Sequence, residues 1–327
     1  MSIFDGPADR LPQRAGYLLL PNFSLMAFSS AIEPLRAANV ISGKTLYEWT
    51  ILSIDGQPVT ASNGITLVPE YGMVDRGYDF VAIIGGTGAE RMQDPALLNW
   101  CRRLVRMGTD LGAISSGPYV LANAGLLDNR VCTIHWEFLD GFREDHPDLE
   151  VSNELYEIDG PIFTVSGGTA SIDVMSRLIE VQHGHALAAH VSEWFIHKRI
   201  RDRSEHQRMD LRSRVGVSHP KLLAAIELME ANLELTLNRE DIAQQVSLST
   251  RQLERLFRKY LNSTPRRYYF ALRMHKAQVL LRQTSMPILD IALASGFVSA
   301  SHFAKCYREF FGRTPREDRM PHGTPDR

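Results

Sequence analysis

Residues 112–128 read GAISSGPYVLANAGLLD, and this stretch decides how the first part of the chain folds. The apolar run LGAIS leads into a turn of small residues, and a helical pattern leaves the turn toward Gly125. This order is typical of a strand that delivers a nucleophile to the N-terminus of a helix, where backbone N–H groups can hold an oxyanion. A cysteine is expected at such a turn because a helix N-terminus stabilises a thiolate. This chain instead has Ser115 followed by Ser116.

Strand and helix patterns alternate on both sides of this turn. A hairpin is predicted within 149–168, around Asp159-Gly160. The alternation implies a mostly parallel sheet that is covered by helices on both faces. The other predicted strands are 14–21, 47–54, 64–69 and 78–86, and the predicted helices are 24–41, 95–108, 169–184 and 186–200.

The composition excludes several classes of protein. A chain of 327 residues is long enough for two domains. No apolar run approaches the roughly 18 residues of a membrane helix, and the N-terminus shows no secretion signal. The three cysteines have neither metal-ligand nor redox spacing, so we predict a cytoplasmic protein without a metal site or a cofactor.

The net charge of −2 hides an asymmetry along the chain. Residues 1–197 carry 12 Lys and Arg against 24 Asp and Glu, whereas residues 221–327 carry 17 against 11. This distribution suggests that only the C-terminal part meets nucleic acid. Residues 202–220 are polar and rich in arginine, which makes them the best candidate for a linker, although an extended helical arm is an alternative.

The C-terminal part contains a repeat. The segments DIAQQVSLSTRQLERLFRKYLNSTP (241–265, the first module) and DIALASGFVSASHFAKCYREFFGRTP (290–315, the second module) align at an offset of 49 before their turns and 50 after them. Each module has the pattern of a helix-turn-helix. Ser249 is expected to cap the second helix of its module with Gln252 as the capping-box partner, and Leu253, Leu256, Phe257 and Tyr260 are expected on the inner side of that helix.

The second helix of each module would lie in a major groove of DNA, with its N-terminal residues at base edges. In the first module the predicted readers are Thr250, Arg251, Gln252 and Arg255. The second module has smaller and weaker readers, namely Ser299, Ala300, Ser301, His302 and Lys305. Candidate phosphate contacts on the connecting helix are Arg266, Arg267, Arg273 and Lys276.

The C-terminal part resembles the DNA-binding domain of AraC-family transcription regulators. The resemblance rests on IAQQVSLSTRQLERLFRKYLNSTPRRYY, RMHKAQVLL and IALASGFVSASHFAKCYREFFGRTP. It implies binding to tandem major grooves, one helical turn apart on one face of the DNA. One departure is PREDR (315–319), where the family usually has an aromatic residue followed by arginine. We expect this departure to loosen the C-terminal end.

The first ~185 residues resemble the class I glutamine-amidotransferase-like superfamily, through IIGG (83–86), the 112–128 turn, TIHW (133–136) and Glu33. The resemblance implies an α/β fold of the flavodoxin-like type, a sandwich around a parallel sheet. Together the two parts resemble the GlxA-type regulators, and longer runs such as SEWFIHKRIRDRSEHQR (192–208) narrow the match to regulators of glycine betaine, carnitine, dimethylglycine or arginine catabolism. That branch implies an activator that senses a small nitrogenous metabolite.

Ser115 raises the alternative of a hydrolase or amidase tethered to DNA. A serine nucleophile needs a base within hydrogen-bond reach, and His135, oriented by Glu137 or Asp140, is the nearest candidate. The spacing shows no such triad, so we predict no enzyme activity. A third possibility is a protein whose N-terminal part only dimerises.

A retained pocket is the favoured interpretation. The amides of Ser115 and Ser116 and the glycines Gly85 and Gly86 would hold a carboxylate. Aromatic faces and an acid would hold a cationic end. The predicted residues for that end are Phe23, Tyr119, Trp136, Glu33 and Glu137, with His135 beside them.

The sequence therefore predicts four segments with different roles. They are an effector-sensing and dimerisation domain (1–185), a connecting helix and linker (186–220), an all-α DNA-binding domain with two helix-turn-helix motifs (221–320) and a disordered tail (321–327). The expected partners are DNA, a small-molecule effector, RNA polymerase and a second copy of the chain, without a membrane.

Overall fold

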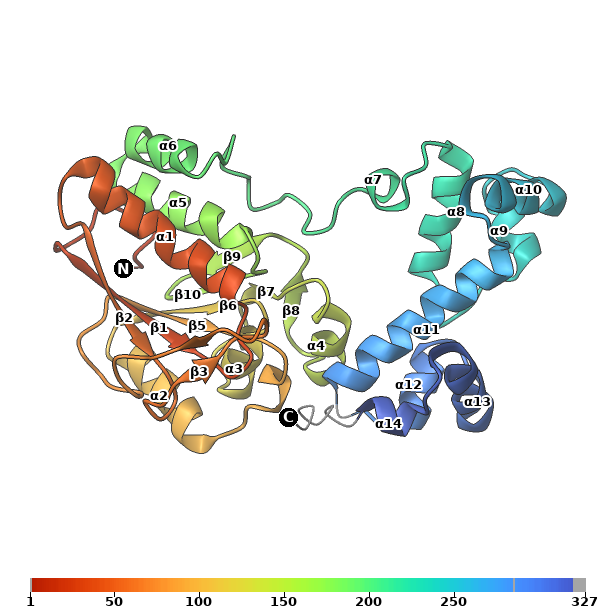
Figure 1. The fold of residues 1–327 in the computed structure, drawn as a ribbon, viewed down its shortest axis with the longest axis horizontal. Coiled ribbons are helices and arrows are strands. Elements are labelled where there is room, and N and C mark those ends of the chain that lie inside the picture. Colours follow the sequence, from red (N-terminus) through yellow and green to blue (C-terminus); the bar gives the residue numbers. More distant parts are fainter. Residues whose placement is uncertain (1, 285, 320–327) are drawn as a thin grey trace. The chain divides into compact units, whose positions relative to one another are not determined.

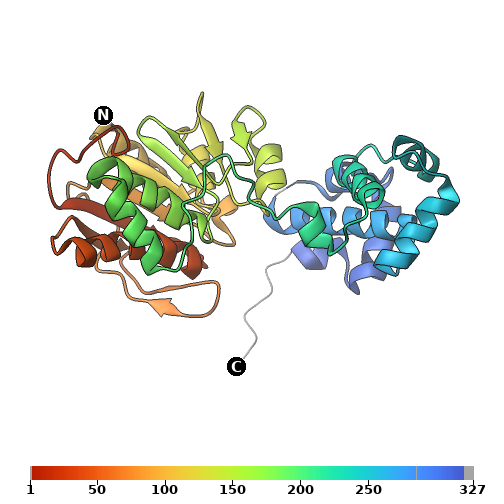
Figure 2. The same cartoon turned by 90° about the horizontal axis from the view of Figure 1, so that it is seen from above.

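The computed structural model describes residues 2–284 and 286–319. The chain divides into two compact units, Met1–Gln207 (the front unit) and Arg208–Arg327 (the back unit), which Figures 1 and 2 show in colours that follow the sequence. The predicted tail at 321–327 lies outside the described residues. Among the residues described, none of the helices is both long and apolar enough to cross a membrane.

The front unit is built on a six-stranded sheet of order β2-β1-β5-β6-β10-β9. All neighbouring strands are parallel except β10 and β9, which pair Ile162 with Asp159 in an antiparallel hairpin. The predicted parallel sheet and the predicted hairpin are therefore confirmed. The strands are β1 (Gln13–Leu19), β2 (Tyr47–Leu52), β5 (Phe80–Ile84), β6 (Asp110–Ile114), β9 (Tyr156–Asp159) and β10 (Ile162–Val165).

Helices cover both faces of this sheet (Figure 1), as the uninterrupted apolar strands require. Alternate residues of β1 enter different cores, because successive side chains point to opposite faces. Tyr17 and Leu19 pack with one helix group, whereas Leu18 and Leu20 pack with the other. The first group is α1 (Leu25–Ser42), α5 (Ala170–His183) and α6 (His185–Trp194), and the second is α2 (Pro95–Arg106), α3 (Pro118–Asn123) and α4 (Leu139–Asp145).

Short elements complete the front unit. The predicted strand at 64–69 contributes only β4, which pairs with β3 outside the main sheet. Strands β7 and β8 form a second, parallel pair. The bounds are β3 (Val59–Thr60), β4 (Thr66–Leu67), η1 (Ala89–Arg91), β7 (Val131–Thr133) and β8 (Glu150–Ser152).

The segment expected as a connecting helix and linker, 186–220, is shared between the two units. Helix α6 and the residues up to Gln207 belong to the front unit. Beyond Arg208 the chain enters α7 (Leu211–Val215), and Leu211 and Val217 are buried in the core of the back unit. Arg214 of α7 forms an ion pair with Glu230 at 2.8 Å. Only the few residues between Gln207 and α7 therefore connect the two folded units along the chain.

The back unit is helical, as predicted, and it has two separate cores. The longest helix, α11, contributes Tyr269 to the first core and Met274 and Leu281 to the second. Its helices, besides α7, are α8 (Pro220–Ala231), α9 (Arg239–Gln245), α10 (Thr250–Leu261), α11 (Pro265–Gln283), α12 (Ile288–Ala294), α13 (Ala300–Phe311) and α14 (Pro315–Arg319).

The turns of the two modules have the same geometry. Leu248 donates its N–H to the Ala243 carbonyl at 2.8 Å, and Phe297 donates to the Ala292 carbonyl at the same distance. Ser247 (φ 53°) and Gly296 (φ 75°) hold equivalent left-handed positions. The additional residue of the second module is then Val298, whose side chain is 92% exposed. An insertion at an exposed turn leaves the packed helices unchanged.

Two expectations for the back unit are wrong. Tyr260 does not belong to the inner side of α10, because it is 40% exposed and lies against the ring of His219. The sequence PREDR does not loosen the C-terminal end. The buried Asp318 carboxylate accepts hydrogen bonds from Tyr307 at 2.6 Å and Gln278 at 3.0 Å, and forms an ion pair with Arg282. This network attaches α14 to α11 and α13.

Candidate effector site and nucleic-acid interface

The turn after β6 is a sharp elbow. Ser115 adopts a left-handed backbone conformation with φ 65°, which is uncommon for a residue other than glycine. Its N–H donates to the Val165 carbonyl at 2.9 Å, and its carbonyl accepts from the His135 N–H at 3.2 Å. The Ser115 amide is thus committed to β10 in this structure, so it cannot at the same time donate to a carboxylate as expected from the sequence.

Glycines allow the backbone to approach the elbow closely. A Cβ atom at Gly85 would lie 2.2 Å from the amide nitrogen of Gly117, and one at Gly86 would lie 1.7 Å from the Asn22 carbonyl oxygen. Ser116 is fully buried and donates its hydroxyl to the Gly86 carbonyl at 2.7 Å. The residues Gly85, Gly86, Ser115 and Ser116 are therefore brought together, but the Ser116 hydroxyl serves the elbow itself.

The described part of the chain gives Ser115 no base of the kind that a serine nucleophile requires. Among the residues described, no hydrogen bond joins its hydroxyl to a base. The His135 Nδ1 atom accepts a hydrogen bond from the Glu137 N–H at 3.3 Å, so its ring proton belongs on Nε2, the other nitrogen. Burial lowers the pKa of His135, which favours the neutral ring. The histidine therefore reaches the elbow through its backbone and is not oriented as a general base.

The aromatic candidates do not gather into one cage. Phe23 is fully buried in one core, whereas Tyr119 is 1% exposed in the core on the other face of the sheet, with its ring 4.8 Å from Phe142. Trp136 is 43% exposed, and its ring lies 5.5 Å from that of His135. Of the predicted aromatic residues, Trp136 is the one at the surface near the elbow.

The two acids also differ in position. Glu33 lies in the middle of α1 and pairs with Arg36 at 2.6 Å, one turn further along the same helix. Glu137 is exposed and follows Trp136 directly. The elbow, His135, Trp136 and Glu137 thus form one neighbourhood, which we call the elbow surface, whereas Glu33 has its own partner.

The residues from His197 to Gln207 form a strap that is bound to the front unit, which the sequence did not reveal. Asp173, fully buried on α5, pairs with His197 at 2.9 Å and with Arg201 at 2.7 Å. Gln207 donates its amide to Thr133 Oγ1 at 3.0 Å and to the carbonyls of Ile134 and Glu154, both at 2.9 Å. The strap therefore ends on the strand and loop that lead directly into His135 and Trp136.

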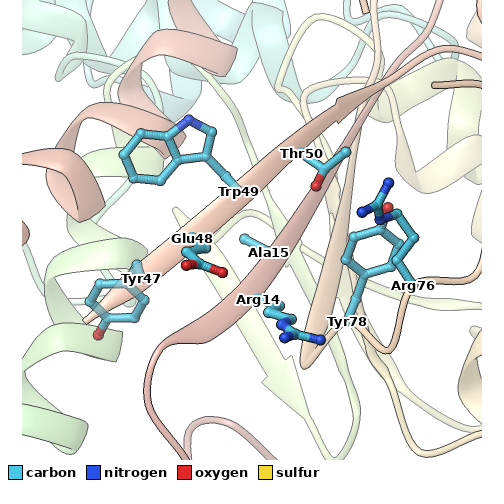
Figure 3. Close-up of a pocket in the computed structure, with 8 residues that line it drawn as sticks. All are labelled: Arg14, Ala15, Tyr47, Glu48, Trp49, Thr50, Arg76 and Tyr78. Atoms are coloured by element: carbon cyan, nitrogen blue, oxygen red, sulfur yellow. The ribbon is translucent and has the colours of Figure 1, made fainter. Parts of the chain in front are cut away.

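A separate hollow of about 470 Å³ lies at the edge strand β2 (Figure 3). Arg14 and Glu48 are register partners near the amino ends of β1 and β2, and Arg76 stacks on Tyr71 with 4.4 Å between the guanidinium and the ring. The elbow follows the carboxyl end of β6, whereas Arg14 and Glu48 lie near the opposite, amino ends of their strands. None of the predicted effector residues lines this hollow, whose walls are Arg14, Ala15, Tyr47, Glu48, Trp49, Thr50, Arg76 and Tyr78.

In the back unit, α10 and α13 are the candidate reading helices. Ser249 caps α10 and forms the predicted capping box with Gln252, whose side chain accepts from the Ser249 N–H at 2.8 Å. This bond occupies the Gln252 oxygen, so reading of adenine through that oxygen would require the cap to open. Arg251 and Arg255 are exposed and form no ion pair within the described residues, while Glu254 is neutralised by Arg239 at 2.7 Å.

The second reading helix presents smaller side chains. Ser299 accepts from the His302 N–H at 3.2 Å and is therefore the N-cap of α13. Ser301, His302 and Lys305 are exposed, and Ala300 is half-buried. His302 lines a cleft of about 1000 Å³ between the two modules, together with Arg266 and Arg267 from the start of α11.

One predicted phosphate contact is wrong for this structure. Arg266 and Arg267 are exposed in the first turn of α11 and can reach a ligand. Arg273, in contrast, donates from Nε to the Ser295 carbonyl at 2.8 Å and from an Nη atom to the Gly296 carbonyl at 2.6 Å. The crossing of α11 and α12 brings the Arg273 guanidinium to the turn of the second module. Because it is hydrogen-bonded there, it does not contact a phosphate in this arrangement.

Comparison with known proteins matches the front and back units to two different families. The DJ-1/PfpI family matches residues 17–181, and a helix-turn-helix domain matches residues 242–320. The chain is 46% identical to the HTH-type transcriptional regulator GbdR of Pseudomonas aeruginosa over 322 residues, which is 98% of this chain and 88% of GbdR. It is 47% identical to CdhR of the same species, over 93% of this chain and 90% of CdhR.

A more distant relative and a solved structure extend the comparison. The HTH-type transcriptional regulator GlxA of Rhizobium meliloti is 37% identical over 95% of this chain and 97% of its own length. The crystal structure of an AraC family transcriptional regulator from Pseudomonas putida is 26% identical with a TM-score of 0.51, and covers 56% of this chain and 100% of that chain. The chain therefore belongs to the family of HTH-type transcriptional regulators, related to GbdR, CdhR and GlxA, in which a DJ-1/PfpI domain precedes an AraC-type DNA-binding domain.

Proposed function

We propose that the protein is a cytoplasmic transcription activator whose elbow surface binds a small nitrogenous metabolite of the betaine, carnitine, dimethylglycine or arginine type. The observation that carries this proposal is that the elbow has the backbone geometry of a nucleophile site without the reactive groups of one. The left-handed Ser115 and the close glycine packing are those of a nucleophile site, yet serine stands in place of the thiol, and no base in the described part of the chain is hydrogen-bonded to its hydroxyl. A site that has this backbone geometry but neither the thiol nor a base is suited to binding a ligand rather than to hydrolysing it.

The chemistry of the elbow surface suits a zwitterion that carries a cationic nitrogen. The indole of Trp136, which is 43% exposed, would supply an aromatic face to a quaternary or guanidinium group, at about 0.5–2 kcal/mol for a cation–π contact. The carboxylate of Glu137, the next residue, supplies negative charge beside it. The Nε2–H of His135 would donate to the carboxylate of the ligand.

On the DNA side, α10 and α13 would enter successive major grooves about one helical turn apart. The exposed Arg251 and Arg255 would supply most of the base readout, and the second module would mainly fix the position on the backbone. We further propose that the active form is a homodimer, because two copies of the reading unit increase specificity on a two-fold operator, and that it contacts RNA polymerase.

A thermal-shift screen of the full-length protein against betaine, dimethylglycine, carnitine, choline and arginine tests the effector assignment. A ligand at about 100 times its Kd adds about 2.7 kcal/mol to the stability of the unit that binds it. We expect one compound to raise the melting temperature, and Trp136→Ala to remove that shift. Trp194→Ala is the matched control, since Trp194 is a similarly exposed tryptophan on α6.

The enzyme alternative is tested with the same ligand. We expect Ser115→Ala to keep the full ligand-induced shift and full activation of a reporter gene, because no step requires the hydroxyl. Loss of the response in Ser115→Ala, with the fold intact, would favour a serine-dependent reaction. No shift with any compound and no effect of Trp136→Ala on activation would reject the elbow surface as the effector site.

A further inference from the structure

Beside the long helix that joins the two modules, the loop before the first module lies against the turn of the second module. Helix α11 packs its first half into the first core and its second half into the second core. At the middle of the helix, Tyr269 and Arg273 lie one turn apart and therefore on the same face. Tyr269 holds the loop that precedes the first module, whereas Arg273 holds the turn of the second module.

Tyr269 holds the loop that precedes the first module. Its hydroxyl donates to the Asn232 carbonyl and accepts a hydrogen bond from the Leu237 N–H at 3.4 Å. The residues from Asn232 to Leu237 are thus attached to α11. Arg273 holds the turn of the second module through the Ser295 and Gly296 carbonyls, and its guanidinium lies 4.2 Å from the centre of the Phe297 ring.

The two held segments touch each other. A Cβ atom added at Gly296 would lie 2.6 Å from the Leu233 carbonyl oxygen and 2.7 Å from the Thr236 side chain. Phe297 in turn packs against Phe303 at 5.4 Å and against His302 at 5.7 Å, both in the first turns of α13. A movement of the turn would therefore move the second reading helix relative to the first.

We infer that Arg273 is a positioning residue for DNA recognition, which fixes the rotation and spacing of the two reading helices so that both fit one spacing of half-sites. The inference rests on the proposed tandem binding mode. Two hydrogen bonds from a planar guanidinium to successive carbonyls define an orientation, which a lysine with a single ammonium group cannot reproduce. Arg273 itself does not need to touch the DNA.

The experiment measures affinity as a function of half-site spacing. Full-length protein selects its operator from a random DNA pool, and fluorescence anisotropy then compares duplexes in which the spacing between half-sites is changed by one base pair. One base pair rotates the half-sites by about 34° relative to each other. We expect the wild-type protein to lose about tenfold in affinity for each change, and Arg273→Gln to lose less than about threefold.

Arg214→Gln is the matched control. Arg214 also makes two hydrogen bonds with a partly buried guanidinium, to the Glu230 carboxylate at 3.1 and 2.8 Å, but both partners lie on the first-module side of the back unit. It should keep the steep wild-type dependence on spacing. A uniform loss of affinity in Arg273→Gln, with that dependence also unchanged, would overturn the inference.

Two further outcomes are distinguishable. A wild-type protein that is itself insensitive to spacing would overturn the tandem binding mode and the inference together. If Arg273→Gln fails to fold by circular dichroism, Arg273→Lys replaces it, because lysine keeps the charge and can reach one carbonyl. A folded Arg273→Lys variant with an intermediate spacing penalty supports the inference, and one with the wild-type spacing profile refutes it.

Discussion

We expect the substitution Asp173→Asn to detach the strap, residues 197–207, from the rest of the front unit. The Asp173 carboxylate is fully buried and accepts four hydrogen bonds, one from His197 and three from the backbone and side chain of Arg201. Asparagine has one acceptor oxygen and places an N–H₂ group against a donor. Removing one partner of a buried ion pair costs about 3–5 kcal/mol. Since the side chain of Arg201 is 27% exposed, water can partly replace the lost partner, which favours the lower end of that range.

The variant should therefore lose about 3 kcal/mol, or about 6–12 °C in the melting temperature of the front unit, at 2–4 °C per kcal/mol for a domain of this size. Limited trypsin digestion gives a local measurement, because the strap contains Lys198, Arg199, Arg201 and Arg203. If detaching the strap costs about 3 kcal/mol less, the detached state is populated about 100-fold more, and the peptide bonds after these residues are cleaved correspondingly faster. Cleavage at the strap and the melting temperature report the same loss independently.

Asp202→Asn is the control for this prediction. Asp202 lies in the same strap, but its side chain is exposed and binds Ser204, two residues further on. It should change neither the cleavage rate at the strap nor the melting temperature by much. If Asp173→Asn leaves the strap as resistant to trypsin as the Asp202→Asn control does, the reasoning that the buried carboxylate holds the strap is wrong.

Three other outcomes follow from the contacts described. Arg251→Ala should cost about 1–3 kcal/mol in operator affinity without changing the melting temperature, and unchanged affinity would exclude Arg251 as a base reader. Replacing Arg266 or Arg267 by glutamine should reduce the slope of log K against log salt by about 0.9 each, whereas an unaltered slope would exclude a phosphate contact. Partial desolvation and the nearby carboxylates of Glu90 and Glu144 raise the pKa of Asp145 to about 6, so folding favours the protonated form and stability falls as the pH rises from about 4 to 6. Asp145→Asn should remove this fall, by no more than about 1 kcal/mol because the side chain is exposed, and identical pH profiles would contradict the coupling.

Sequence reasoning succeeded where the signal is local. The capping box at Ser249 and Gln252 depends on residues three apart, and the structure contains both of its hydrogen bonds. The hairpin around Asp159-Gly160 and the duplicated turns are similarly short-range patterns. The repeat of the two modules also predicted both helix-turn-helix motifs, because the positions that the two copies share mark the helices and the turn.

The missed features depend on segments that are distant in the chain. Asp173 and Gln207 acquire their roles from partners 24 to 74 residues away, and their own neighbours carry no pattern that indicates this. Arg273 has the same residue type and exposed-helix pattern as Arg266 and Arg267, yet the crossing of α11 and α12 turns it toward a backbone turn. Resemblance places Glu33 in the pocket and cation–π chemistry places Tyr119 there, whereas their immediate surroundings in the fold supply other partners.

The geometry of the elbow also restricts which mutations the front unit can accumulate. Position 115 must tolerate a left-handed backbone, which glycine, asparagine and aspartate adopt readily and β-branched residues do not. Gly167, with φ 91°, lies opposite, and a Cβ atom there would stand 2.9 Å from that of Ser115. Larger residues are therefore excluded at 167 by sterics and disfavoured at 115 by backbone energy. The structure therefore accommodates only a few small or polar residues at this turn, and the same limits preserve the shape of the elbow whether or not the turn carries out catalysis.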